Sequence, residues 1–341
     1  MVKSTTKKSD IFAVAKAARV SPSTVSRSFN HPDLVKPETR RRIEKAIRKL
    51  GYIRNRAAQT MHGIRSGTIG LIVPTVDQAI FAELIQSFSE AIEELGFTIL
   101  LASHGYSLDR EYALARKMLE HRVDGMALIG TEHMAETYDL LVEQATPTLL
   151  LWNYAADTPF ACVGCDNFEA GRLIGGHVAA LGHQEIATIF PPMGGNDRAS
   201  RRQDGALSAL RAAGRDVPEA WRLETPYEVG AAKAAVEALV ASGRLPTAIL
   251  CGNDVLAVGA LHALRHRGID VPGAITVTGI GDFNGSAEFE PGLTTVRIPA
   301  RTIGSRAAAA MVRLTGGEAE PGARIPPELM VRGTCAPPRA G

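Results

Sequence analysis

"VSPSTVSRSFN", residues 20–30, predicts a short helix with an unusual exposed face. Ser21 is a good N-cap, and Pro22 suits the first helical position. Val25 and Phe29 lie four residues apart, so they share the side that packs inward. The other sides carry hydroxyl, amide and guanidinium groups and no acid, in Ser23, Thr24, Ser26, Arg27 and Asn30. Such a face is suited to an anionic partner.

Two more helices are expected around this one. Residues 10–20 place apolar side chains at helical spacing before a tight turn, and residues 37–50 form a third helix that Gly51 is placed to end. Two short helices braced by a third form a helix-turn-helix unit, so the expected anion is DNA. Hydroxyl and amide groups bind phosphate oxygens, and Arg27 can form two hydrogen bonds with guanine. A plain three-helix bundle is the alternative, against which the acid-free face argues.

The charge of the chain is unevenly distributed. Residues 1–66 hold 16 Lys/Arg and 4 Asp/Glu, a net charge of +12, whereas the rest of the chain holds 22 bases and 32 acids, a net charge of −10. A basic head on an acidic body is typical of a protein with one nucleic-acid-binding domain. A solvated basic extension is the alternative.

The stretches VSPSTVSRSFN, VKPETRRRIEKAIRKLGYIRNRAAQTM and SGTIGLIVP resemble the lactose-repressor family of bacterial transcription regulators, over nearly the whole chain. In that family, three positions of the recognition helix read major-groove bases, and they match Pro22, Ser23 and Arg27. The positions that contact phosphates match Ser21, Thr24, Ser26 and Asn30. The resemblance therefore implies a regulator that binds double-stranded DNA at a pseudo-palindromic operator.

Residues 55–63, NRAAQTMHG, match the hinge helix of the family, which folds only on DNA and inserts an apolar side chain into the minor groove. The matching residue is Met61, where the family usually has leucine, and methionine is apolar and flexible enough for this role. Read without the family, Met61 is just as well a linker side chain. The resemblance implies further DNA contacts from Asn55, Arg56 and Ala58.

Two residues of the head depart from the family pattern. Arg19 stands in the turn where the family usually has glycine, and a left-handed backbone at an arginine costs roughly 1–2 kcal/mol. Asp10 stands where a hydroxyl residue is common, so we expect it to cap the first helix instead of binding phosphate.

After Gly67, short β-branched runs alternate with amphipathic helices in two successive sets. This alternation predicts two α/β lobes with parallel sheets, and the resemblance implies the two-lobed arrangement of periplasmic binding proteins. Lobe 1 is expected at about 67–162 plus 298–330, and lobe 2 at about 163–297. Cys162 and Cys165 have C-x-x-C spacing, but their strand-like surroundings favour a core strand over a zinc or redox site.

Ligands of open parallel sheets bind beyond the carboxyl ends of the strands, which predicts an effector site between the lobes. The candidate residues follow strands or match family contact positions: Phe81, His104, His133, Trp152, Asp166, Arg198, Arg202, Asn253 and Asp282. Many polar residues at strand ends are helix caps instead, and for Asn253 this alternative has equal weight.

The family resemblance also suggests the chemistry of the effector. The family usually has two acids after the penultimate strand, but this chain has Gly281 in the first place and keeps only Asp282. Losing an acid removes repulsion against an anionic ligand. The segments GTEH, LLLWNY, NDR and GIGDF resemble the gluconate-repressor branch, so we expect a sugar acid such as gluconate or ketogluconate.

The sequence favours a ligand-controlled repressor over two other classes. A sugar-binding protein without a DNA role would not need the basic head. An enzyme is not expected, because no nucleophile elbow, phosphate loop or metal-ligand cluster occurs, so no catalytic residue, metal or cofactor is assigned. No apolar run of about 18 residues or secretory signal occurs, so a cytoplasmic location without membrane contact is expected. Two operator half-sites require a homodimer, and the C-terminal stretch VRGTCAPPRAG lacks the leucine heptads of tetramers.

Overall fold

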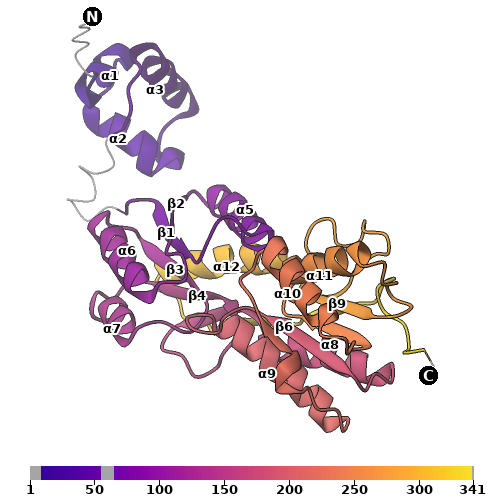
Figure 1. Cartoon of the computed structure of the whole chain (residues 1–341). Coiled ribbons are helices and arrows are strands. Elements are labelled where there is room, and N and C mark those ends of the chain that lie inside the picture. Colours follow the sequence, from indigo (N-terminus) through magenta and orange to yellow (C-terminus); the bar gives the residue numbers. More distant parts are fainter. Residues whose placement is uncertain (1–8, 55–64, 340–341) are drawn as a thin grey trace, which may run out of the picture. The chain divides into compact units, whose positions relative to one another are not determined.

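The computed structural model describes residues 9–54 and 65–339, and the chain divides into two compact units, 1–66 and 67–341 (Figure 1). Four of the expected DNA contacts lie outside the described residues: Asn55, Arg56, Ala58 and Met61. In the described part of the chain, no helix is long and apolar enough to cross a membrane.

The first unit is a head of three helices around a small apolar core. The helices are α1 Ile11–Ala18, α2 Pro22–Asn30 and α3 Pro37–Leu50, with a 3-10 turn η1 at Pro32–Leu34. Asp10 caps α1 by accepting a 2.8 Å hydrogen bond from the Ala13 N–H, and Ser21 caps α2 by accepting one from the Thr24 N–H. Arg19 follows α1 in the left-handed conformation, with φ 56°. These features confirm the predicted helix-turn-helix head and both predicted caps.

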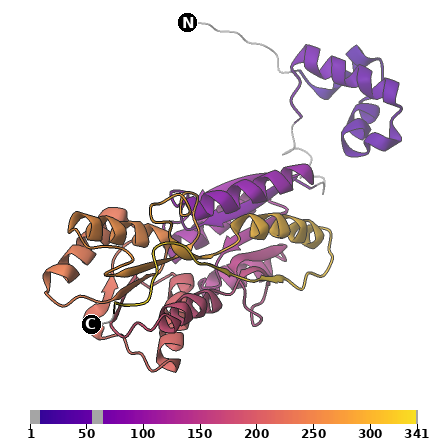
Figure 2. The ribbon, with the colours of Figure 1, turned by 90° about the vertical axis from the view of Figure 1, so that its right-hand side faces the viewer.

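Lobe 1 of the second unit is a six-stranded parallel sheet with strand order β11-β5-β4-β3-β1-β2. Its strands are β1 Thr68–Val73, β2 Thr98–Ser103, β3 Gly125–Ile129, β4 Thr148–Asn153, β5 Ala161–Cys165 and β11 Ala323–Ile325. Ile69 and Leu71 of β1 face the core under α5 (Ala79–Glu94) and α12 (Ala300–Thr315), which lie side by side (Figure 2). Ile72 faces the opposite side, under α6 (Leu108–Glu120) and α7 (Ala135–Glu143).

Lobe 2 has a second six-stranded sheet with strand order β12-β10-β9-β8-β6-β7, parallel except for β12. Its strands are β6 Ile186–Phe190, β7 Arg222–Glu224, β8 Ala248–Cys251, β9 Thr276–Gly281, β10 Thr294–Arg297 and β12 Glu328–Met330. Two helix pairs cover the sheet, and a 3-10 turn η2 (Glu219–Trp221) precedes β7. The pairs are α8 (Asn167–Ala180) with α9 (Asp197–Ala212), and α10 (Val229–Ala241) with α11 (Asp254–His266).

The lobe boundaries differ from the expected ones at two points. We expected lobe 2 to begin at about 163, but β5 pairs with β4 and β11 in the sheet of lobe 1. We expected lobe 1 to continue to 330, but β12 pairs with β10 in lobe 2. Both errors have one physical reason: a short apolar run predicts a strand, whereas the sheet it joins is set by partners far away in the sequence. The core-strand interpretation of Cys162 and Cys165 is confirmed, because both thiols are buried in β5.

Candidate functional site

The predicted contact face of the head gathers hydroxyl groups at the start of α2. The Ser21 Oγ atom lies 2.7 Å from Ser23 Oγ and 2.8 Å from Thr24 Oγ1, at the N-terminus of the helix. Ser23 and Arg27 are exposed, whereas Val25 is fully buried on the opposite side. Hydroxyl groups at the N-terminus of a helix are suited to binding phosphate oxygens.

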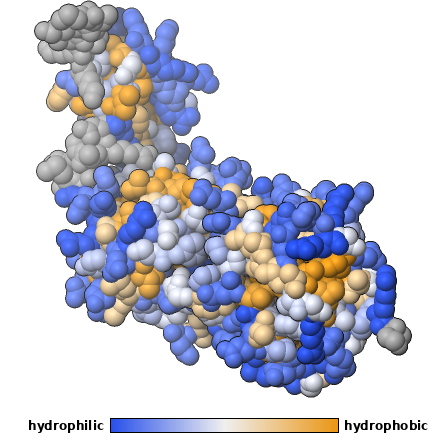
Figure 3. All heavy atoms as spheres, in the orientation of Figure 1, coloured by the Kyte–Doolittle hydropathy of each residue, from blue (hydrophilic) through white to orange (hydrophobic). Residues whose placement is uncertain are grey.

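The end of α2 is tied to a residue that the sequence analysis missed. Arg54 donates a hydrogen bond from Nη2 to Asn30 Oδ1, and its guanidinium lies 5.1 Å from the centre of the Phe29 ring. The two residues are separated by 24 positions, so no local pattern signals their contact. The outer side of α3 adds hydrophilic and mostly basic side chains to the head (Figure 3).

A narrow cavity of about 20 Å³ lies between the two lobes. Residues of both lobes line this cavity, which we call the floor of the cleft. They are Gln78, Phe81, Tyr106, Trp152, Asn196, Arg198, Arg202, Tyr227, Asn253 and Phe283. A wider cavity of about 510 Å³ shares four of these residues, Gln78, Tyr106, Asn196 and Tyr227, so the two form one cleft. The floor thus includes five of the nine predicted effector residues: Phe81, Trp152, Arg198, Arg202 and Asn253.

Two buried side chains of this floor carry N–H groups without a protein partner, Trp152 at Nε1 and Arg198 at Nη2. Trp152 comes from the end of β4 in lobe 1 and is 1% exposed, and Arg198 comes from the start of α9 in lobe 2 and is 5% exposed. A buried polar group without a partner costs about 1–3 kcal/mol, so an acceptor from a ligand or a water would stabilise each of these N–H groups. The Trp152 ring also packs against Phe81, with ring centres 5.4 Å apart.

Three of the six non-glycine residues with positive φ in the described part of the chain lie in or next to this cleft. Tyr106, Trp152 and Asp282 have φ values of 61°, 78° and 55°, in the left-handed region that L-residues seldom adopt. Each such residue costs on the order of 1–3 kcal/mol and persists because its surroundings fix it, typically at binding sites.

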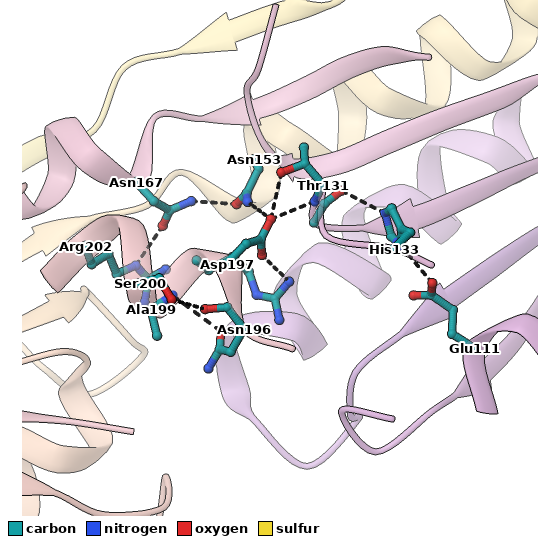
Figure 4. A network of polar contacts seen from close by, with 12 residues as sticks. Glu111, Thr131, His133, Asn153, Asn167, Asn196, Asp197, Ala199, Ser200 and Arg202 are labelled. Carbon is teal, nitrogen blue, oxygen red and sulfur yellow. Dashed lines mark hydrogen bonds and ion pairs between the residues drawn. The ribbon is translucent and has the colours of Figure 1, made fainter. Parts of the chain in front are cut away.

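Asp197 connects the lobes through a buried polar network (Figure 4). Its carboxylate, on lobe 2, accepts hydrogen bonds from Thr131 and from the Asn153 side chain, both on lobe 1. Asn153 Oδ1 in turn accepts a 2.7 Å bond from Asn167, whose Oδ1 accepts a 2.7 Å bond from Arg202 Nε. Burial alone raises the pKa of Asp197, but Arg198 and Thr131 outweigh it, and the pKa is lowered overall. The carboxylate is therefore held in its charged form.

The two predicted histidines lie in a different cluster, inside lobe 1. His133 Nδ1 lies 2.7 Å from the buried carboxylate of Glu111, and His104 Nε2 lies 3.6 Å from the same group. His133 Nε2 also faces the Gly130 carbonyl oxygen, at 3.2 Å. Burial is the main cause that lowers the pKa of His104. Neither histidine lines the floor, so the structure does not bring them together with the other candidates.

Asp166 and Asp282 also lie outside the floor, because each carboxylate serves partners within the protein. Asp166 caps α8 and forms a 2.8 Å ion pair with Arg324. Asp282 forms 2.7 Å ion pairs with Arg297 and Arg332. These partners are remote in the sequence, which is why the pattern at the strand ends suggested a ligand role.

Gly281 explains how an aromatic ring enters the floor. Its φ is 140°, and a Cβ atom at this position would lie only 2.1 Å from the ring of Phe283. The expected effect of Gly281 was the loss of a charge. The structure adds a second effect, since only a residue without a side chain leaves room for the Phe283 ring beside the cavity.

Asn253 caps a helix and also lines the floor, so it combines the two roles that the sequence suggested. Its Oδ1 caps α11 by accepting a 3.0 Å hydrogen bond from the Leu256 N–H, and the residue also lines the floor. Because the cap uses the oxygen, the amide N–H groups are left for a ligand.

Comparisons with known proteins agree with both units. The family model "Bacterial regulatory proteins, lacI family" matches residues 11–55, and "Periplasmic binding protein-like domain" matches residues 176–335. The HTH-type transcriptional repressor PurR of Klebsiella pneumoniae subsp. pneumoniae is 30% identical over 296 residues, which are 86% of either chain. This chain belongs to the LacI family. It is therefore a DNA-binding transcriptional repressor with an effector-binding domain, and not an enzyme, as predicted.

Solved structures of transcription regulators share this fold. The lac repressor dimer bound to operator and the anti-inducer ONPF superposes with a TM-score of 0.86 at 25% identity, covering 97% of this chain and all of that one. The transcription regulator GntR from Chromobacterium violaceum superposes with a TM-score of 0.74 at 29% identity, covering 78% of this chain and 98% of that one. The two-lobed fold of this LacI-family chain is thus confirmed.

Proposed function

We propose that this repressor binds a sugar acid, such as gluconate or ketogluconate, in the cleft between its lobes, and that the acid controls operator binding by a homodimer. One observation carries the proposal: the floor offers two buried, unpartnered N–H donors, Trp152 Nε1 and Arg198 Nη2, one from each lobe. A carboxylate has two oxygens that only accept hydrogen bonds, so it suits both donors at once.

Charge supports an acid over a neutral sugar. Arg198 already binds Asp197 through Nη1 at 3.0 Å, but that carboxylate is shared with Thr131 and Asn153. Arg202, fully buried beside it, has an asparagine and a carbonyl oxygen as hydrogen-bond partners. Among the described residues, Arg198 thus forms an ion pair with one shared carboxylate, whereas Arg202 forms no ion pair and has Asp254 only as a more distant source of negative charge. A hydroxyl group can accept from Trp152, but it adds no charge to balance the second guanidinium.

The shape of the cleft supports an elongated ligand with its carboxylate at the floor. A cavity of about 20 Å³ has room for only one small group, whereas the adjoining 510 Å³ fits a polyol chain. Tyr106, Asn196 and Tyr227 line the junction and supply hydroxyl and amide groups for hydrogen bonds. Burial raises the pKa of Tyr106 to about 12, so its hydroxyl stays neutral and can donate to a sugar oxygen.

The DNA side of the proposal rests on α2. Ser23 and Arg27 would read bases, with Pro22 beside them, while Ser21, Thr24, Ser26 and Asn30 would bind phosphates. A ligand that bridges Trp152 and Arg198 favours the closed lobes, and this differential affinity is what shifts the equilibrium between DNA-binding states. We propose that closure weakens operator binding. The hinge role of Met61 remains a prediction.

Thermal stabilisation by a matched ligand pair tests the effector. Gluconate and glucitol differ only in having a carboxylate or a CH₂OH group at one end. A ligand present at about 100 times its dissociation constant adds about 2.7 kcal/mol to stability. We expect stabilisation by gluconate or ketogluconate and none by glucitol, glucose, pentoses or purines. Stabilisation by a neutral sugar or a purine alone would refute the acid.

A pair of variants on one helix ties the ligand to its site. Arg198→Gln removes the charge at the floor, whereas Arg211→Gln removes an exposed charge from the last turn of the same helix α9. We expect Arg198→Gln to abolish stabilisation by the acid and Arg211→Gln to retain it. Equal responses of the two variants would exclude Arg198 as the carboxylate-binding group. Adding the acid to a complex with DNA then tests the direction of control.

A further inference from the structure

Arg54 bridges the recognition helix and the chain that leaves the head. Its Nη2 donates to the side-chain oxygen of Asn30, the last residue of α2. Arg54 is also the last described residue before position 55. One side chain thus connects the C-terminal end of α2 with the stretch that follows α3.

The Arg54 guanidinium lies over an aromatic ring of the head, next to a second ring. It is 5.1 Å from the centre of the Phe29 ring, and the Phe29 ring centre is 6.5 Å from that of Tyr52. Both rings pack against the apolar core of the head, and Arg54 itself is partly buried. An arginine stacked on an aromatic face and bound to an amide is restricted in two independent ways.

The hydrogen bond determines which atoms Asn30 presents to DNA. An asparagine amide has one oxygen, which accepts, and one NH₂ group, which donates. Phosphate oxygens accept only, so a phosphate contact needs the NH₂ group. Since Arg54 engages Oδ1, the amide is turned with Nδ2 away from the guanidinium. The NH₂ group that a phosphate contact needs is therefore not used by Arg54.

We propose that Arg54 is a positioning residue of the DNA interface: it orients the Asn30 amide toward an operator phosphate. The proposal rests on the DNA binding of the family and not on the effector. It concerns DNA alone, so its test needs no effector and does not depend on the identity of the acid.

A double-mutant cycle tests this role in the full chain. The probe is a palindromic duplex that the wild-type protein selects from a random library, and affinity is measured by fluorescence anisotropy. The variants are Arg54→Ala, Asn30→Ala and the double variant. Arg41→Ala, which removes an exposed arginine from the middle of α3, is the charge-matched control. Thermal unfolding and circular dichroism check that each variant is folded.

We expect Arg54→Ala and Asn30→Ala each to weaken binding about tenfold, which corresponds to 1.4 kcal/mol. The double variant should be little weaker than either single variant, because both remove the same contact. Arg54→Lys should rescue only in part, since an ammonium group lacks the planar fork and the stacking surface.

Salt dependence separates positioning from a direct phosphate contact. A cation that binds phosphate itself lowers the slope of log affinity against log salt by about 0.9 when it is removed. For a positioning residue, we expect Arg54→Ala to leave the slope as it is in wild type. Additive losses with a reduced slope, or an affinity equal to that of Arg41→Ala, would overturn the proposal.

Discussion

Thr131 binds the Asp197 carboxylate twice across the boundary between the lobes, through its backbone N–H at 2.7 Å and its hydroxyl at 2.8 Å. Both bonds reach the same oxygen, Oδ2, while Oδ1 binds Arg198 on the floor of the cleft. A single carboxylate thus joins the contact between the lobes to the group proposed to hold the effector. A change of Asp197 is therefore expected to affect both the contact between the lobes and the binding of the effector.

Asp197→Asn should therefore weaken the contact between the lobes, although it also removes a negative charge beside the proposed carboxylate site. The variant leaves the buried Arg198 without its charged partner, and loss of one partner from a buried ion pair typically costs about 3–5 kcal/mol. Thr131→Val removes only the hydroxyl bond and should cost about 1 kcal/mol. Urea unfolding gives the stabilities and calorimetry gives the affinities for gluconate. Equal losses of stability in Asp197→Asn and Thr131→Val would contradict this ranking.

Trp152→Phe tests the donor on the opposite lobe. The change keeps an aromatic ring beside Phe81 but removes the indole N–H. A hydrogen bond to a charged group contributes about 1.5–3 kcal/mol, so affinity for the acid should fall by at least about tenfold. Stability without ligand should rise or stay unchanged, because an unpartnered buried donor disappears. An unchanged affinity would show that the carboxylate binds elsewhere.

Gly281→Ala should damage the floor more than an ordinary glycine substitution does. The new Cβ atom would meet the Phe283 ring at 2.1 Å, and φ is 140°. Gly285→Ala is the matched control, because its φ is also positive, at 97°, but nothing lies within 4 Å of its Cβ position. The control should show the backbone cost alone, on the order of 1 kcal/mol, and keep its affinity for the acid. Gly281→Ala should lose more stability and bind the acid less well, as measured by urea unfolding and calorimetry.

Stability should decrease as the pH falls below about 6.5. Burial lowers the pKa values of His104, His177 and His183 from 6.5. The unfolded chain then holds more protons than the folded one between the lowered values and 6.5, so the folded state loses stability with acidification, by at most about 1.4 kcal/mol per pH unit for each histidine. Urea unfolding at about pH 7.5 and about pH 5.5 measures the difference. His183→Gln should reduce it; an equal or larger difference in the variant would contradict the assignment to His183.

The head could be predicted from the sequence because its signals are local. Ser21 and Asp10 bind N–H groups three residues away, and Gly51 ends α3 in the left-handed conformation, so the residues that form each helix also mark its ends. The contact between Arg54 and Asn30 was missed because it joins residues 24 positions apart. Its geometry depends on how α2 and α3 pack, which no helical pattern specifies.

The cleft could be predicted in outline but not in detail. The carboxyl ends of the strands meet between the lobes, and this rule suffices to find Trp152, Arg198 and Asn253. It cannot exclude Asp166 and Asp282, because the arginines that bind them come from β11, β10 and the stretch after β12. The bridge from Thr131 to Asp197 spans 66 residues and two sheets, so it likewise depends on tertiary structure.

The strands β11 and β12 are separated by only two residues, yet β11 completes the edge of one sheet and β12 the edge of the other. On the ribosome, these strands are made after every other strand of the described chain. Neither lobe can therefore finish its sheet until this stretch leaves the exit tunnel, although most of lobe 1 is synthesised much earlier. A nascent chain or a truncation that ends before Ala323 would expose β5 and β10 as open edges, one in each lobe, and such edges invite aggregation.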